Sequence, residues 1–146
     1  GVEVDDTPHK RIVEGPFFLR SPDGKRIFIV YSANGCWSDD YCLGLLEYQG
    51  GDPCRKAAWK KHPEPVFAKG CGVFGTGHAS FFKSPDGTET WVAYHALARS
   101  DPEEKPLPRH MHLQKISFDA HGFPVFGPPV APGRPMPPPA SGAKWK

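Results

Sequence analysis

The feature of this sequence that most constrains its fold is a short pattern that occurs twice. Residues 21–24 read Ser-Pro-Asp-Gly and so do residues 84–87, and a tyrosine follows each copy, Tyr31 and Tyr94, at the same offset of 63 residues. Apolar runs flank the pattern on both sides in each copy. Proline presets φ at the first corner of a turn and Asp-Gly supplies a positive φ, so each copy predicts a β-hairpin. Such a repeat indicates two similar structural units.

Two more short apolar runs follow each hairpin. They cover residues 41–46 and 65–67 in the first copy, and residues 111–118 and 124–126 in the second. Four strands in each unit is the content of one blade of a β-propeller. The chain also contains 16 glycines and 18 prolines, as expected for many short strands joined by turns. We therefore predict an all-β fold with two four-stranded antiparallel propeller blades.

The predicted blades cover about residues 10–70 and 71–127. Two blades cannot close a ring, because each blade buries its faces against its neighbours. The missing neighbours are expected either in a longer polypeptide or in further copies of the chain. The start at Gly1, without methionine or leader segment, favours a processed or truncated chain. Residues 128–146 hold seven prolines and predict an extended C-terminal tail with no role in the core.

Composition argues against several classes of partner. The formal net charge is only +2 and the basic residues are scattered, so a nucleic acid or an anionic lipid surface is not expected. No apolar run approaches the roughly 20 residues that a membrane helix needs. A hydrophobic fraction of 38% and a charged fraction of 23% are those of a globular chain.

The four cysteines, Cys36, Cys42, Cys54 and Cys71, contain no C-x-x-C pair, which disfavours a zinc site. One or two disulfides in a secreted protein is the favoured interpretation. Buried free thiols in a cytosolic protein are the alternative.

A carboxylate stands at the start of the first strand, between Val13 and Pro16. By the repeat offset, Glu14 corresponds to Gly77, which is next to His78. The innermost strands of a propeller line its central channel, so Glu14 and His78 are expected near each other at one end of that channel. Apolar neighbours would favour the protonated carboxyl and keep a proton available for a leaving group. The alternatives are a glutamate that caps a loop or pairs with a lysine, and a buried histidine bonded to backbone.

Several motifs, in order along residues 12–127, resemble glycoside hydrolase family 43. They are Val-Glu-Gly-Pro at 13–16, Val-Tyr-Ser-Ala-Asn at 30–34, Tyr-Cys-Leu-Gly-Leu-Leu at 41–46, Gly-Thr-Gly-His-Ala-Ser at 75–80, Trp-Val-Ala-Tyr-His-Ala at 91–96 and the ending at 119–127. Residues 36–41, Cys-Trp-Ser-Asp-Asp-Tyr, are most similar to the arabinofuranosidase-like branches of the family.

The resemblance implies the last two blades of a five-bladed propeller that hydrolyses arabinose or xylose linkages with inversion. It implies an aspartate base on the first blade, a modulating aspartate on the third and a glutamate acid on the fourth. Glu14 matches the acid. His78 matches a histidine that helps to hold calcium or another ion in the channel, and Arg109 matches an arginine that reaches the active-site carboxylates. No organic cofactor is implied.

The family's base has no counterpart in this chain, since none of its candidate aspartates lies in the base motif. These are Asp5, Asp6, Asp39 and Asp40. Trp37 and Tyr41 are candidates for stacking on a sugar ring, with packing between blades as the alternative. Trp59 and Trp91 are interpreted as core residues. His110 and His112 share one face of a strand, where a metal contact is a minor alternative.

The sequence thus predicts a secreted protein that supplies the general acid of an inverting glycosidase acting on arabinose- or xylose-containing plant polysaccharides. Its partners would be the carbohydrate and the remaining blades. The rival hypothesis is a sugar-binding or structural half-propeller, in which copies of the chain close a ring.

Overall fold

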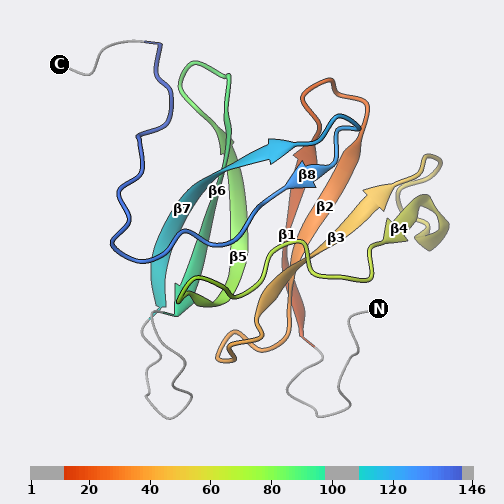
Figure 1. Ribbon diagram of the computed structural model, residues 1–146. Helices are drawn as coiled ribbons and strands as arrows, with labels where there is room; N and C mark the ends of the chain where they lie inside the picture. The colour runs from red at the N-terminus through yellow and green to blue at the C-terminus, as the bar shows by residue number, and fades with distance from the viewer. Residues whose placement is uncertain (1–11, 98–108, 143–146) are drawn as a thin grey trace.

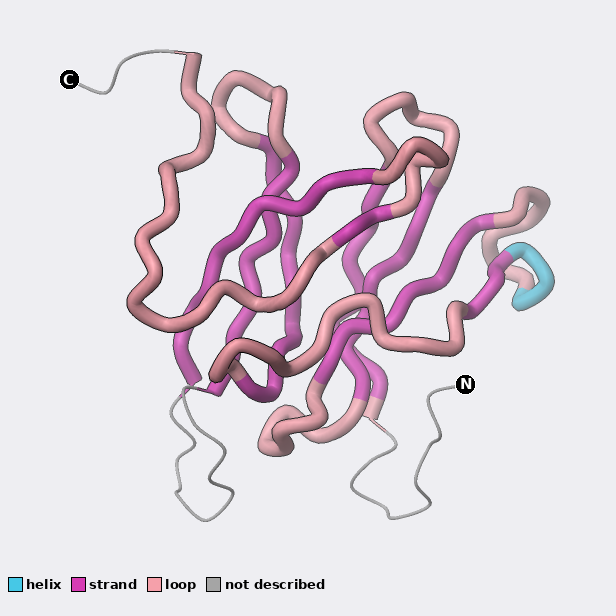
Figure 2. Tube along the Cα trace, viewed as in Figure 1, coloured by secondary structure: helices cyan, strands magenta, loops and turns pink. Residues whose placement is uncertain are grey.

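The computed structural model describes residues 12–97 and 109–142, and strands dominate them (Figure 2). The strands form two four-stranded antiparallel sheets, each in chain order (Figure 1). The first sheet contains β1 (Val13–Arg20), β2 (Ile27–Ala33), β3 (Cys42–Tyr48) and β4 (Trp59–Lys61), with a short 3-10 helix, η1 (Lys56–Ala58), before β4. The second contains β5 (Phe74–Lys83), β6 (Thr90–Leu97), β7 (Arg109–Phe118) and β8 (Pro124–Val125). The predicted all-β fold with two four-stranded sheets is confirmed. No helix in the described ranges is long and apolar enough to cross a membrane.

The sequence repeat is preserved in the register of the strands. Glu14 of β1 lies opposite Ser32 of β2, and Gly77 of β5 lies opposite His95 of β6. Both residues of the second pair follow those of the first by 63 positions in the chain. The hairpin turns are also closed alike. In the first, Ser21 Oγ donates to Asp23 Oδ1 at 2.6 Å and accepts from the Arg26 N–H at 2.9 Å, and the second turn repeats both bonds.

The two sheets share one hydrophobic core, because β5 packs against β1, β2 and β3. Fully buried side chains come from both sheets, including Phe28, Leu43, Leu45 and Val92. The connection between the sheets contributes Phe67, whose ring centroid lies 4.9 Å from that of Tyr94. Burial of this apolar surface is the main force that holds the sheets together.

The fourth strand of the first sheet lies earlier than predicted, at Trp59–Lys61 instead of residues 65–67. Residues 65–67 make only a single bridge, between Leu43 and Phe67, since Phe67 turns into the core between the sheets. Trp59 is not a core residue. Its ring packs on Tyr48, with centroids 5.2 Å apart, at the rim of an open surface.

The expected disulfides do not form, and all four cysteines are free. Cys42 lies buried in β3, whereas the others lie in three different loops. Burial raises the pKa of the Cys42 thiol to about 11. The thiols are therefore free, as in the alternative, but only Cys42 is buried; Cys54 and Cys71 are exposed.

The proline-rich segment is extended, as predicted, but it is attached to the second sheet (Figure 1). Gln114 of β7 is buried, and its Oε1 accepts hydrogen bonds from the Tyr94 hydroxyl at 3.0 Å and the Val130 N–H at 3.2 Å. Further along, the Ala140 N–H donates to Glu89 at 3.0 Å. Pro129 is buried. The prediction that this segment has no role in the core is therefore wrong for its first residues.

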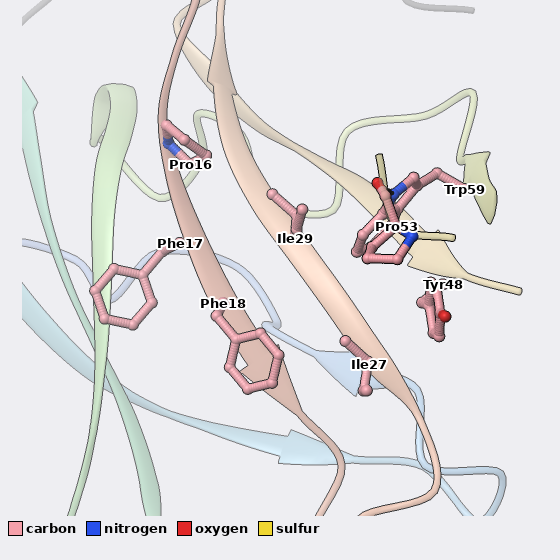
Figure 3. A pocket seen from close by; sticks show the side chains of 8 residues that line it. All are labelled: Pro16, Phe17, Phe18, Ile27, Ile29, Tyr48, Pro53 and Trp59. Atoms are coloured by element: carbon pink, nitrogen blue, oxygen red, sulfur yellow. Dashed lines mark hydrogen bonds between the residues drawn. The ribbon is translucent and has the colours of Figure 1, made fainter. Parts of the chain in front are cut away.

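The face of the first sheet that points away from the second is apolar and open (Figure 3). Phe17 turns towards the second sheet and contacts Phe81, whereas Phe18 is 56% exposed on the open side. We call this surface the open face. The residues around its depression are Pro16, Phe17, Phe18, Ile27, Ile29, Tyr48, Pro53 and Trp59.

A partly buried ion-pair network joins the sheets at the end that carries the hairpin turns. The Glu47 carboxylate accepts from Arg26 and lies 3.0 Å from His62 Nε2, and Arg26 also donates to the His121 carbonyl at 3.1 Å. The Arg26 guanidinium lies 5.8 Å from the ring centre of Phe123. Burial acts to raise the pKa of Glu47, but the bonds and charges of His62 and Arg26 outweigh it, and the pKa lies below its ordinary value.

We predict that Glu47→Gln lowers the free energy of unfolding by about 2 kcal/mol at pH 7, because it breaks a partly buried charge network. A lowered pKa means that the carboxylate stabilises the fold above the pKa of the unfolded chain and loses this effect as the pH falls through the folded pKa. The difference between wild type and variant should therefore shrink in acid, in urea unfolding followed from pH 7 to pH 3. The exposed pair Asp52–Arg55 provides the control, since Asp52→Asn should cost less than about 1 kcal/mol. An equal effect of both substitutions would contradict the assignment.

Gln114→Leu should release the proline-rich segment, because it leaves the Tyr94 hydroxyl and the Val130 N–H without their acceptor. We expect a loss of about 2 kcal/mol in unfolding free energy and faster proteolysis within residues 128–142. Gln49→Leu, at an exposed position, is the matched control and should change neither measurement. Unchanged proteolysis of the Gln114 variant would show that other contacts hold the segment.

Candidate active site

The innermost strands of both sheets carry the same irregularity near their beginnings. A β-bulge follows Glu14 in β1 and Gly77 in β5, and it holds Gly15 at φ +55° and His78 at φ +52°. Glycine adopts this conformation freely, whereas for histidine it is strained, which makes His78 a candidate for a functional role. The bulge in β5 places the His78 ring against Gly15, where an added Cβ would lie 3.5 Å from the imidazole. Glycine suits position 15 because of its positive φ, and the His78 ring packs against its backbone beside Glu14.

The backbone of His78 is fixed from the first sheet. Its N–H donates to Ser32 Oγ at 2.7 Å, and Ser32 is fully buried. Since Ser32 also lies opposite Glu14 in the register, one residue of β2 aligns the beginnings of both inner strands. The predicted proximity of Glu14 and His78 is what the structure has.

Glu14 presents its two carboxyl oxygens to different partners. Oε1 accepts a hydrogen bond from the Tyr41 hydroxyl at 2.7 Å, and Oε2 lies 4.0 Å from His78 Nδ1. The side chain is 38% exposed, and its neighbour Val13 is 66% exposed. The expected apolar enclosure of the carboxyl is therefore incomplete in this structure, since Glu14 and its neighbours Val13 and Pro16 line one open depression together.

Tyr41 lies deeper than predicted. It is fully buried, and its ring is parallel to that of His95, with an interplanar angle of 8° and centroids 5.4 Å apart. The ring also lies on the backbone of Gly77, where an added Cβ would come within 2.1 Å of it. Burial raises the pKa of Tyr41 well above its ordinary value, and the Glu14 carboxylate adds to the shift, so the hydroxyl stays protonated. The ring is not open to a sugar, and the predicted stacking role does not fit its position.

His95 belongs to the site, although sequence reasoning did not single it out. Burial, with smaller effects from the charges of Arg109 and His78, lowers its pKa to about 4, so the ring is neutral at neutral pH. Its Nδ1 is buried and has no hydrogen-bond partner among the described residues. The repeat offset carried a signal for this residue, since the offset that pairs Glu14 with Gly77 also pairs Ser32 with His95.

Arg109 and Trp37 lie at the surface. Arg109 begins β7 and is exposed, and its charge reaches His95. Trp37 is 44% exposed in the loop between β2 and β3, with its ring over Gly35. Asp40, in the same loop, pairs with Lys69 at 2.9 Å. Asp5 and Asp6 lie outside the described residues. Contact of Arg109 and Trp37 with a substrate stays a prediction.

The described residues do not form a metal site by themselves. No group of three or more His, Cys, Asp or Glu side chains in the described ranges is placed to hold an ion. Calcium takes six to eight oxygen ligands, which one histidine does not provide. His112 is instead packed on Tyr94, with centroids 5.4 Å apart. The residues present therefore do not fit an ion held by this chain alone.

Solved structures with similar folds include an arabinofuranosidase and a family-43 glycoside hydrolase. The chain superposes on an α-L-arabinofuranosidase from Lactobacillus brevis with a TM-score of 0.74 and 31% identity, covering 85% of this chain and 39% of that one. A thermostable family-43 glycoside hydrolase gives a TM-score of 0.72 with 30% identity, covering 88% and 39%. The two sheets are therefore propeller blades, and they correspond to only part of each of these proteins.

Curated relatives agree. The chain is 36% identical over 134 residues to the extracellular exo-α-(1→5)-L-arabinofuranosidase of Streptomyces avermitilis, covering 88% of this chain and 27% of that protein. It is 34% identical over 114 residues to α-L-arabinofuranosidase B of Pyricularia oryzae, covering 74% and 23%. The chain thus spans about a quarter of the length of these relatives.

The sequence also matches the model of a protein family over most of its length, and the matched residues include Glu14, Tyr41, His78 and His95. Residues 4–124 match the glycosyl hydrolases family 43, and the chain belongs to that family.

Proposed function

We propose that this chain carries the general acid, Glu14, of an inverting glycoside hydrolase whose complete form cleaves arabinose or xylose linkages in plant polysaccharides. The observation that supports this most is the setting of Glu14. Its carboxyl is held at one oxygen by Tyr41 and is accessible at the end of the inner strands, where a substrate can approach it.

The chemistry needs one more carboxylate than this site offers. In an inverting hydrolysis the acid gives its proton to the leaving oxygen as the glycosidic bond breaks. A second carboxylate, about 6.5–9.5 Å away, takes a proton from the water that attacks the opposite face of the sugar. Family 43 resemblance assigns that base to an earlier blade, so the active form is proposed to need blades beyond these two.

The open face supports the same proposal. A surface that exposes Phe18 beside Ile29 and Trp59 is costly in water and suits the flank of a neighbouring blade. The solved relatives of the chain are more than twice as long as the part it covers. The neighbour is proposed to be a further blade of the same protein.

The names of the relatives narrow the substrate and the location. The relatives named above are arabinofuranosidases, and one of them is named extracellular. We take an arabinofuranoside as the preferred substrate and a secreted protein as the setting.

Glu14→Gln should lower kcat of the full-length product of the gene on α-1,5-linked arabinobiose, whose leaving group needs a proton, by at least about 100-fold. Binding of arabinose should be retained, because the amide preserves the shape of the side chain. Glu64→Gln, at an exposed position in the same blade, is the control and should leave kcat unchanged. NMR of the first-formed sugar should show the inverted anomer. Full activity of the Glu14 variant, or a retained anomer, would overturn the proposal.

Phe18→Asp tests what covers the open face. In the full-length product we expect a loss of about 3 kcal/mol in unfolding free energy, because the side chain would be buried there. In the isolated chain the loss should be small, since Phe18 is already 56% exposed. Val125→Asp, 45% exposed in the outermost strand of the other blade, is the control and should have equal effects in both forms. The rival hypothesis, in which copies of the chain close a ring, would be favoured by two results for the isolated wild-type chain. It would form a homogeneous oligomer, and its free energy of unfolding would rise with protein concentration.

A further inference from the structure

We propose that Tyr41 is a positioning residue for the acid, holding Glu14 so that the transferred proton is carried by Oε2. This inference rests on the proposed function, since it assigns a role within the same site. It replaces the contact with sugar that the sequence suggested for Tyr41.

The hydrogen bond fixes which oxygen carries the proton. The Tyr41 hydroxyl has one proton to donate, and it donates that proton to Glu14 Oε1 over 2.7 Å. Oε1 is therefore occupied as an acceptor, and a proton on the Glu14 carboxyl belongs on Oε2. Oε2 is the oxygen on the side of His78, at 4.0 Å from Nδ1, and the Glu14 side chain is partly open to solvent. A leaving oxygen can reach that position.

The ring of Tyr41 cannot easily move away. One face lies on the Gly77 backbone, which has no side chain to displace it, and the ring is stacked in parallel with His95. Gly77 and His95 belong to the second blade, whereas Glu14 belongs to the first. Tyr41 therefore sets the acid relative to both blades.

The loop that ends at Tyr41 is anchored as well. The Gly75 N–H donates to the Asp39 carbonyl at 3.0 Å, and Asn34 Nδ2 donates to the Asp40 carbonyl at 2.7 Å. These bonds tie the residues before Tyr41 to the beginning of β5 and to the end of β2. The hydroxyl is thus placed by the fold before any substrate arrives, as electrostatic preorganisation requires.

The bond also has a role in the chemical step. Glu14 becomes negatively charged as it gives up its proton, and a hydrogen bond to a charged acceptor is stronger than one to a neutral acceptor. Tyr41 therefore stabilises Glu14 more after proton transfer than before it. This gain matters for substrates whose leaving group needs a proton, and little for those whose leaving group departs as a stable anion.

The test compares two substrates in the full-length gene product. One is α-1,5-linked arabinobiose, with a poor leaving group, and the other is an aryl α-L-arabinofuranoside of an acidic phenol. Tyr41→Phe keeps the ring and removes only the hydroxyl. We expect it to lower kcat on arabinobiose about tenfold, with KM unchanged, and to lower kcat on the aryl substrate less than about twofold. Tyr94→Phe is the matched control, since it removes a buried hydroxyl bonded to Gln114 in the core and should leave the ratio of the two kcat values unchanged.

The outcomes separate the two proposals. If Glu14→Gln shows the leaving-group dependence and Tyr41→Phe lowers both rates equally, Tyr41 is only structural and the inference is overturned. If Glu14→Gln shows no such dependence, Glu14 is not the acid and the proposed function fails.

A measurement independent of activity tests the bond itself. In protein labelled at tyrosine, the Tyr41 hydroxyl proton should give a slowly exchanging, downfield NMR resonance. This resonance should disappear in Tyr41→Phe and change its chemical shift in Glu14→Gln, where an amide replaces the carboxyl acceptor. A resonance unaffected by Glu14→Gln would overturn the inference whatever the activity.

Discussion

The contact on which this site most depends is that between the ring of Tyr41 and the backbone of Gly77. Any side chain at Gly77 would come within 2.1 Å of the ring, so the two blades can approach only because that position is bare. The same approach stacks the ring on His95, while the Tyr41 hydroxyl donates to Glu14 within the first blade. A packing constraint between two sheets thus becomes a geometric constraint on the proposed acid.

The two blades show how one structural unit can serve two chemical purposes. Strand register, turn hydrogen bonds and bulge position recur at one offset along the chain. The side chains at equivalent positions differ, with Gly15 in one bulge and His78 in the other. The backbone is alike in the two blades, and it determines how strands pair and sheets pack. The residues at the bulges differ, and they determine which side chains meet at the site.

Much of the fold followed from local sequence, because turn residues and apolar runs determine where strands begin and end. The prediction of a strand at residues 65–67 was wrong, because Phe67 packs in the core between the two sheets and makes only one bridge to Leu43. No local sequence pattern reveals such a contact. Whether the cysteines pair is decided by the tertiary structure, which leaves them free. The attachment of the proline-rich segment likewise depends on contacts between distant residues, such as the hydrogen bonds of Gln114 to Phe126 and Val130. The motifs led to Glu14 and His78, while the role of Tyr41 and the presence of His95 required the structure.

The sequence by itself determined that the chain is a repeated four-strand unit and that Glu14 and His78 stand at corresponding ends of it. Periodicity and turn chemistry act over a few residues, and they can be read along the chain. Tertiary structure alone decided that Tyr41 is buried, that it donates to Glu14 and that it lies between Gly77 and His95. Tyr41 and Glu14 lie 27 residues apart in the first blade, and Gly77 and His95 belong to the second, so strand pairing and the packing of one sheet on the other are needed to bring them within contact distance.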